Sequence, residues 1–210
     1  MGKGLVVKVF AKKIGMTQVY DKSGKHEAVT VLGLLSTKPC KFKTKEGDGY
    51  NSVIYGLYEN SKPARKSIAN QFGRFGEELV KVVEERVNDG DASKIEIGKE
   101  INTDNFDEGM KVSVVAISKG KGFAGTVKRH GFNTGPKTHG SHNYRQPGSI
   151  GDTGPQRVVK GKKMAGHMGF ERNTIKNVSV IRLEKEKNRI YVSGPIPGAN
   201  KSIVIIVKND

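Results

Sequence analysis

The 210-residue sequence lacks tryptophan, has a single cysteine and contains no long apolar segment. Cys40 alone cannot form an internal disulfide, which indicates a reducing compartment. The longest purely apolar run, residues 203–207, is far shorter than the roughly 20 residues that span a bilayer. Near the N-terminus Lys8 interrupts the apolar run, and Val6 stands where a myristoylation signal has Ser or Thr. We therefore expect a cytoplasmic protein without a membrane partner.

Acidic residues are missing from the middle of the chain, where none occurs between residues 109 and 151. Residues 118–174, the central basic segment, contain eleven Lys and Arg against Asp152 and Glu171, which gives 11 − 2 = +9 of the formal net charge of +16. They also hold twelve of the 27 glycines and four of the five histidines. Because large apolar side chains are few here, we expect no core of its own and a polyanionic partner.

Short runs rich in β-formers lie on both sides of the central basic segment. They are residues 5–11, 17–20, 28–35, 51–58, 111–118, 178–183, 189–192 and 203–207. Turn-forming residues separate them at 21–24, 47–49, 184–188 and 195–198, and the first of these predicts a hairpin. The spacing favours an antiparallel barrel or sandwich over βαβ units, with residues 118–174 inserted within one fold.

Residues 60–110 differ in composition, since eleven of the 21 acidic residues fall between Glu77 and Glu108. A turn signal lies at 88–91. One interpretation is a small helical insert around 63–72 with a binding role of its own. The other, which we favour, is an acidic surface lobe that faces solvent and lies away from any polyanion.

Residues 120–125 match the GxGxxG dinucleotide fingerprint and follow a predicted strand. A Rossmann site also needs an acidic residue about 20 positions further on, and none occurs before Asp152. The surrounding pattern is not βαβ either. We therefore interpret these glycines as positions where the backbone approaches a neighbour or an RNA phosphate closely, beside Lys119 and Lys121.

The histidines of the central basic segment invite a metal or hydrolase interpretation, because His139 and His142 have a plausible ligand spacing. The segment offers no cysteine and almost no carboxylate, which zinc sites and two-metal nucleases require. Ser141 and Ser149 lie in no GxSxG elbow. We expect no metal, no cofactor, no small-molecule substrate and no catalysis. Histidines and Tyr144 among cations suit RNA, on whose bases flat rings stack.

Two further stretches of the segment carry distinct expectations. Residues 157–164 hold Arg157, Lys160, Lys162 and Lys163, and we interpret this cluster as a phosphate contact rather than a solvated turn. Residues 146–155 are the least charged part, and their paired Pro and Gly suit a tight bend at the end of two extended arms. Such a bend would reach into a partner.

At this point the sequence resembles the bacterial form of the large-subunit ribosomal protein L-three family. The motifs that carry the resemblance run in order along both ends and the whole insertion. They are KIGMTQ at 13–18, DGYN at 48–51, SKGKGFAG at 118–125, KRH at 128–130, HGSH at 139–142, PGSIG at 147–151, KGKKMAGHMG at 160–169 and GPIPG at 194–198.

The resemblance implies a mainly β fold, with a β-barrel of the translation-protein type formed by residues 1–117 and 175–210. Residues 60–110 would form a small lobe that contains helix, and 118–174 a long extended loop that binds ribosomal RNA. The family nucleates large-subunit assembly, contacts neighbouring ribosomal proteins and is not itself a catalyst. The implied RNA-binding residues are Lys119, Lys121, Lys128, Arg129, His130, Lys137, His139, His142, Arg145, Arg157, Lys160, Lys162, Lys163, His167 and Arg172.

The resemblance also implies a loop tip near the peptidyl transferase centre, formed by Gln146, Pro147, Gly148, Ser149, Ile150, Gly151, Asp152 and Thr153. Some bacterial members carry a methylated glutamine where this chain has Asp152, so we do not expect that modification. Two other classes remain, an RNA-modifying enzyme and a free RNA chaperone. The enzyme would require carboxylates beside the glycine motif, and the chaperone would have neither an ordered body nor an uncharged tip.

Overall fold

The structure is a computed structural model that describes residues 8–20, 24–58, 66–72, 79–87, 95–100 and 106–208. The chain divides into two compact units. The barrel unit comprises residues 1–117 and 173–210, and the basic unit comprises residues 118–172. Among the described residues, no helix has the length and apolar character that crossing a bilayer requires.

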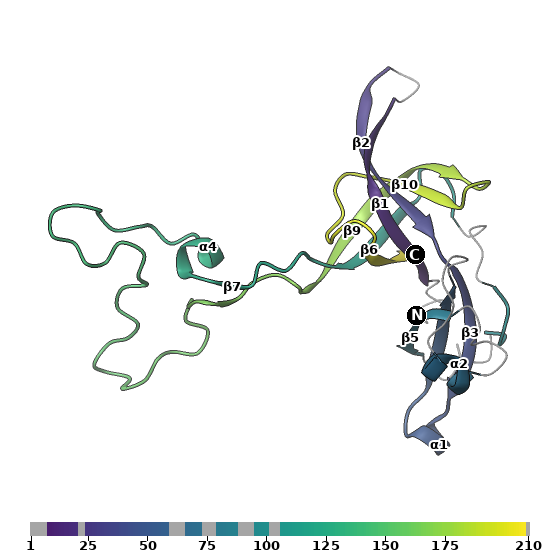
Figure 1. Ribbon diagram of the computed structural model, residues 1–210, viewed down its shortest axis with the longest axis horizontal. Coiled ribbons are helices and arrows are strands. Elements are labelled where there is room, and N and C mark those ends of the chain that lie inside the picture. The colour runs from purple at the N-terminus through teal and green to yellow at the C-terminus, as the bar shows by residue number, and fades with distance from the viewer. Residues whose placement is uncertain are drawn as a thin grey trace. The chain divides into compact units, whose positions relative to one another are not determined.

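The barrel unit is built on a closed antiparallel barrel in the order β1-β11-β6-β9-β10-β2, which confirms the mainly β prediction (Figure 1). Its strands are β1 (Lys8–Tyr20), β2 (His26–Leu34), β6 (Lys111–Ile117), β9 (Arg172–Glu184), β10 (Arg189–Ser193) and β11 (Ile203–Lys208). β1 and β2 form the predicted hairpin, with Tyr20 opposite His26, although residues 21–23 of its turn lie outside the described residues. Of the two architectures left open, the barrel is the one that forms.

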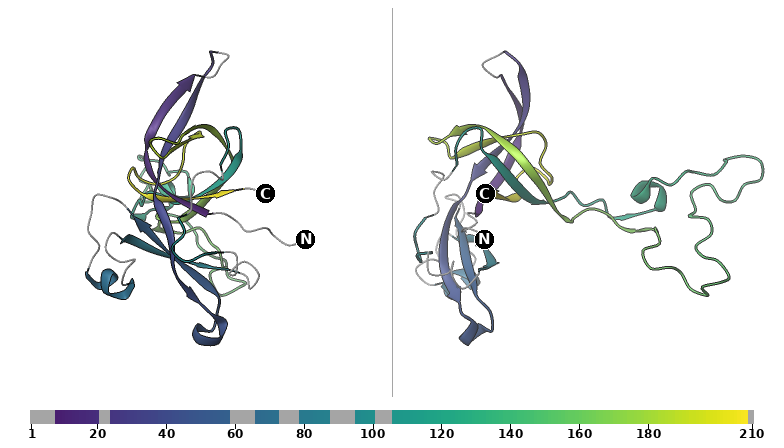
Figure 2. Two further views of the ribbon diagram at one scale, coloured as in Figure 1. Left: turned by 90° about the vertical axis from the view of Figure 1, so that its right-hand side faces the viewer. Right: turned by 180° about the vertical axis from the view of Figure 1, so that it is seen from behind.

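A second sheet in the same unit has the order β3-β4-β5 (Figure 2). Its strands are β3 (Ser36–Lys43), β4 (Ser52–Tyr58) and β5 (Leu79–Arg86). The turn predicted at 47–49 overlaps a single helical turn, α1 (Lys45–Asp48), which ends at Gly49 in the left-handed conformation. The helix that one of the two interpretations placed around 63–72 is described over part of that range, as α2 (Lys66–Phe72). The 88–91 turn lies outside the described residues.

Alternating side chains of β1 link the barrel to the second sheet. Val9 and Ala11 belong to the barrel core, where they pack with residues such as Ile206. Phe10 points the other way and packs with Val53, Tyr55 and Leu57 of β4. Successive side chains of a strand face opposite sides, so one strand contributes to both cores.

The motifs at 13–18 and 194–198 meet in the barrel unit. Lys13 is only 7 % exposed, and its Nζ donates to the carbonyls of Ile196 at 2.6 Å and Gly198 at 3.2 Å. The pairing of β1 with β2 shifts register between Lys13 and Gly15. Because a buried ammonium group needs hydrogen-bond partners, these two carbonyls compensate for the water that Lys13 Nζ loses on burial. These two motifs therefore have a structural role that their sequence did not indicate.

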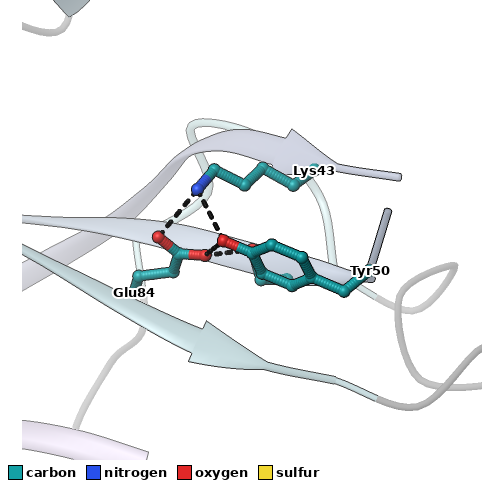
Figure 3. Close-up of polar contacts among 4 residues, drawn as sticks. Lys43, Tyr50 and Glu84 are labelled. Atoms are coloured by element: carbon teal, nitrogen blue, oxygen red, sulfur yellow. Dashed lines mark hydrogen bonds and ion pairs between the residues drawn. The ribbon is translucent and has the colours of Figure 1, made fainter. Parts of the chain in front are cut away.

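A polar cluster on the second sheet centres on Glu84 (Figure 3). The Tyr50 hydroxyl donates to Glu84 Oε1 at 2.6 Å, Ser52 Oγ donates to the same oxygen at 2.8 Å, and Lys43 Nζ donates to Oε2 at 2.9 Å. These bonds, that from Tyr50 foremost, lower the pKa of Glu84 from 4.5 to about 2. The pKa of Lys43 is raised by its bonds to Tyr50 and Glu84.

The cluster predicts how stability depends on pH. A carboxyl group whose pKa is lower in the folded state stabilises the fold above its unfolded value of 4.5, and this contribution is lost as the pH falls toward about 2. Glu84→Gln should therefore lower the free energy of unfolding at neutral pH, and the difference from the unmodified protein should vanish across that acidic window. Urea denaturation of both proteins at a series of pH values measures it.

A matched control for the Glu84 variant is Glu96→Gln. Glu96 pairs with Lys99 at 3.2 Å, and both side chains are 72 % exposed, so little pH-dependent difference is expected. If Glu84→Gln were less stable than the unmodified protein by the same amount from neutral to acidic pH, the pH-dependent stabilisation attributed to Glu84 would be contradicted.

Candidate nucleic-acid interface

The basic unit contains little regular structure. Its elements are the short strands β7 (Phe123–Ala124) and β8 (Gly166–His167), which pair antiparallel, and the helix α4 (Thr126–His130). Residues 131–165, drawn from teal to green in Figure 1, form neither helix nor strand. Of residues 118–172, all of which are described, only Ala124 and Thr126 are buried. The expectation that this stretch builds no core of its own is confirmed.

Backbone hydrogen bonds hold the two ends of the basic unit together. The N–H of Ser118 donates to the carbonyl of Glu171 at 2.9 Å, and that of Lys121 donates to the carbonyl of Met168 at 2.9 Å. Gly169 has φ +73°, and a Cβ added there would collide with the backbone oxygen of Lys119. Only glycine combines this left-handed conformation with such a close approach. Residues 167–169, the end of the motif at 160–169, therefore help to pair the two ends of the basic unit.

The glycines at 120–125 have a structural role and do not form a dinucleotide-binding Rossmann motif. The carbonyl of Gly122 accepts a hydrogen bond from the N–H of Met168 at 3.0 Å. Gly125 precedes α4, which has only five residues. Since β7 pairs antiparallel with β8, the surroundings are not the βαβ unit that a dinucleotide site requires.

Helix α4 is tied to the chain that precedes β8. Arg129 Nη1 donates to the carbonyl of Met164 at 2.8 Å, and Nε2 of His130 lies 3.0 Å from the same oxygen. Both side chains are half-buried. Arg129 and His130 therefore position the chain as well as being candidates for RNA contact, and this positioning role was not predicted.

The other candidate RNA-binding residues are exposed. They are Lys119, Lys121, Lys128, Lys137, His139, His142, Arg145, Arg157, Lys160, Lys162, Lys163, His167 and Arg172. Lys137 Nζ lies 5.2 Å from the centre of the Tyr144 ring, so a cation and an aromatic group adjoin here. No group of three or more His, Cys, Asp or Glu side chains that could hold a metal ion forms among the described residues. Whether these residues bind RNA stays a prediction.

The predicted tip, Gln146 to Thr153, is exposed throughout and has no regular structure. Gly148 has φ +77°, as a tight bend requires. The Thr153 N–H donates to Asp152 Oδ1 at 2.7 Å, and Ser149 Oγ donates to the carbonyl of Gly151 at 2.9 Å. Asp152 therefore uses its carboxylate to shape the local turn.

The structure defines a mainly β protein in which a basic, coreless unit is inserted between two barrel strands. A family model described as "Ribosomal protein L3" matches residues 73–193. Curated proteins named large ribosomal subunit protein uL3 from Bacillus cytotoxicus and Bacillus thuringiensis are each 39 % identical over 199 residues, which cover 94 % of this chain and 94 % of each relative. The chain belongs to the ribosomal protein L3 family.

Proposed function

We propose that the protein is a constituent of the large ribosomal subunit and that its basic unit binds large-subunit ribosomal RNA. The relatives from Bacillus are named as large ribosomal subunit proteins, which supports the subunit. In this proposal the barrel unit is the folded body and residues 118–174 are the RNA-binding loop. The protein works on the cytoplasmic ribosome and supplies no catalytic group.

The observation that carries the proposal is that the cations of the basic unit form no ion pair with any described acidic residue. In the barrel unit, by contrast, Lys8 pairs with Glu85 and Lys43 pairs with Glu84. Cations without acidic partners leave a strong positive field, which RNA phosphates neutralise while they release their own counterions.

The tip and the assembly role are finer parts of the same proposal. Residues 146–153 have no charged side chain except Asp152, so phosphate contact is not their main task. We propose that they approach the peptidyl transferase centre, as the family resemblance implies. Early binding of ribosomal RNA by the basic unit would nucleate subunit assembly, and neighbouring ribosomal proteins would contact the barrel unit.

A salt series tests the proposal directly. Purified protein is titrated with fragments of large-subunit ribosomal RNA at several salt concentrations, with bulk transfer RNA as competitor. We expect the binding constant to fall steeply with salt, because phosphate contacts release counterions, and one fragment to be preferred. Weak, salt-insensitive binding would refute the proposal. A binding constant that falls steeply with salt, but is the same for all fragments, would indicate an RNA chaperone instead.

A further inference from the structure

The two-stranded ribbon of β7 and β8 has one packed face and one open face. Phe123 lies opposite His167, and Ala124 lies opposite Gly166. Because side chains alternate along a strand, each of these cross-strand pairs occupies one face. Ala124 is 3 % exposed, whereas Phe123 is 80 % exposed and His167 is also exposed. The open face therefore presents two neighbouring rings to solvent.

The packed face is backed by α4. A Cβ placed on Gly166 would lie 2.8 Å from Arg129 Nη1, so the Arg129 guanidinium covers the side of the ribbon that Ala124 also faces. Arg129 and His130 are themselves held at the Met164 carbonyl. The open face is thus supported from behind by a fixed layer. A supported surface costs less entropy to order when a ligand binds.

A third exposed ring follows β8. Phe170 is 69 % exposed and has φ +55°, directly after the left-handed Gly169. Bulky residues rarely adopt a left-handed conformation, and strained positions of this kind concentrate at ligand-binding sites. Its exposure means that burial of the ring does not explain the strain.

The charges around these rings favour a nucleic acid as the ligand. Lys119, Lys121 and Arg172 are exposed in the same unit. Glu171 is the one acidic side chain nearby in sequence, and its backbone is used in pairing with Ser118. Aromatic rings beside cations are how proteins hold unpaired RNA, with the rings stacking on bases and the cations contacting phosphates.

We infer that Phe123 and His167 form a stacking platform for an unpaired base of ribosomal RNA, and that Phe170 adds a second stacking surface. Phe123 was not among the residues that the sequence singled out for RNA contact. The inference rests on the proposed function, since it names how the basic unit holds RNA beyond phosphate contact. The platform supplies affinity that does not depend on salt, because stacking releases no counterions.

The test compares Phe123 variants for binding to the preferred ribosomal RNA fragment. Phe123→Ala should weaken binding about 5- to 150-fold, as the loss of one stacked base does. Phe123→Leu, which keeps an apolar side chain but no ring, should also weaken it, and Phe123→Trp should restore it. The slope of the binding constant against salt should stay unchanged in all three. Ile97→Ala is the matched control, because Ile97 is apolar, 48 % exposed, not aromatic and part of the barrel unit.

Ultraviolet crosslinking gives a second readout in assembled large subunits. Mass spectrometry should find a nucleotide attached to Phe123 or His167. A crosslink from these rings to another protein, or unaltered affinity of both Phe123→Ala and Phe123→Leu, would overturn the platform. Those results would leave the proposed function standing if the unmodified protein still bound its fragment with a steep salt slope. Failure of the unmodified protein to bind would refute the proposed function itself.

Discussion

Replacing Lys160, Lys162 and Lys163 together with Glu is expected to weaken binding to large-subunit ribosomal RNA about 100- to 500-fold near 0.1 M salt. The magnitude follows from counterion release, since each phosphate contact contributes about 0.7 to 0.9 to the slope of log K against log salt. Loss of three contacts should therefore flatten that slope by about 2 to 3. Filter binding across a salt series measures both quantities.

The structure indicates that this variant remains folded. All three side chains are exposed, and none of their ammonium groups has a hydrogen-bond or ion-pair partner within the described part of the chain. The nearby turn is held by a backbone bond from Lys162 N–H to the carbonyl of Val159 at 3.2 Å, which the substitutions leave in place. Large-subunit assembly should fail while the circular dichroism spectrum and urea midpoint of the purified variant stay normal.

A control with the same change in net charge separates a local effect from a global one. Lys25, Lys66 and Lys111 are exposed residues of the barrel unit, and their joint replacement with Glu changes the net charge equally. We expect a much smaller loss of RNA affinity from this control. Equal losses in the two triple variants, or normal assembly with the basic cluster reversed, would count against a phosphate role for residues 160–163.

Phe10→Ala is expected to lower the free energy of unfolding by about 3–5 kcal/mol. Phe10 is 1 % exposed, and its ring centre lies 6.1 Å from that of Tyr55. It is the β1 side chain in the core shared by the barrel and the second sheet, where Ile203 and Ile205 of β11 also pack. The loss is a large fraction of the roughly 5–15 kcal/mol that stabilises a typical protein. Urea denaturation followed by circular dichroism measures it.

Phe123→Ala is the natural counterpart of the Phe10 variant, because the chemical change is the same and the ring is 80 % exposed. It should leave the free energy of unfolding nearly unchanged while RNA binding falls. Phe10→Ala should lower the free energy of unfolding but leave RNA affinity nearly unchanged, at temperatures where this variant is still folded. A Phe10 variant as stable as the unmodified protein would show that the second sheet and the barrel are not held by this core.

Local patterns in the sequence were sufficient to predict many of the barrel strands. The runs at 28–35, 111–118, 189–192 and 203–207 agree closely with β2, β6, β10 and β11. Each is rich in β-branched and apolar residues, so the local preference and the tertiary requirement coincide. The absence of a core in the basic unit was equally predictable, because it follows from composition alone.

The second sheet was harder to predict for reasons that individual residues make plain. β3 contains Pro39 and several lysines, which do not indicate a strand, but it lies at the edge of its sheet and shifts register between Pro39 and Lys41. An edge position tolerates proline because one side of the strand donates no ladder bond. β5 was obscured by the acidic character of its neighbourhood, although Leu79 is fully buried and Glu84 accepts bonds from across the sheet. The acidic lobe as a functional unit stays a prediction.

The sequence by itself determined which stretch is basic, which stretch lacks a core and which runs favour strands, because these properties depend on residues close together in the chain. Tertiary structure alone decided that β1 pairs with β11 to close the barrel, that Lys13 is buried against Ile196 and Gly198, and that Phe123 and His167 share a face. Each of these results brings together residues far apart in sequence. Such contacts depend on how whole strands pair and pack, which no local pattern specifies.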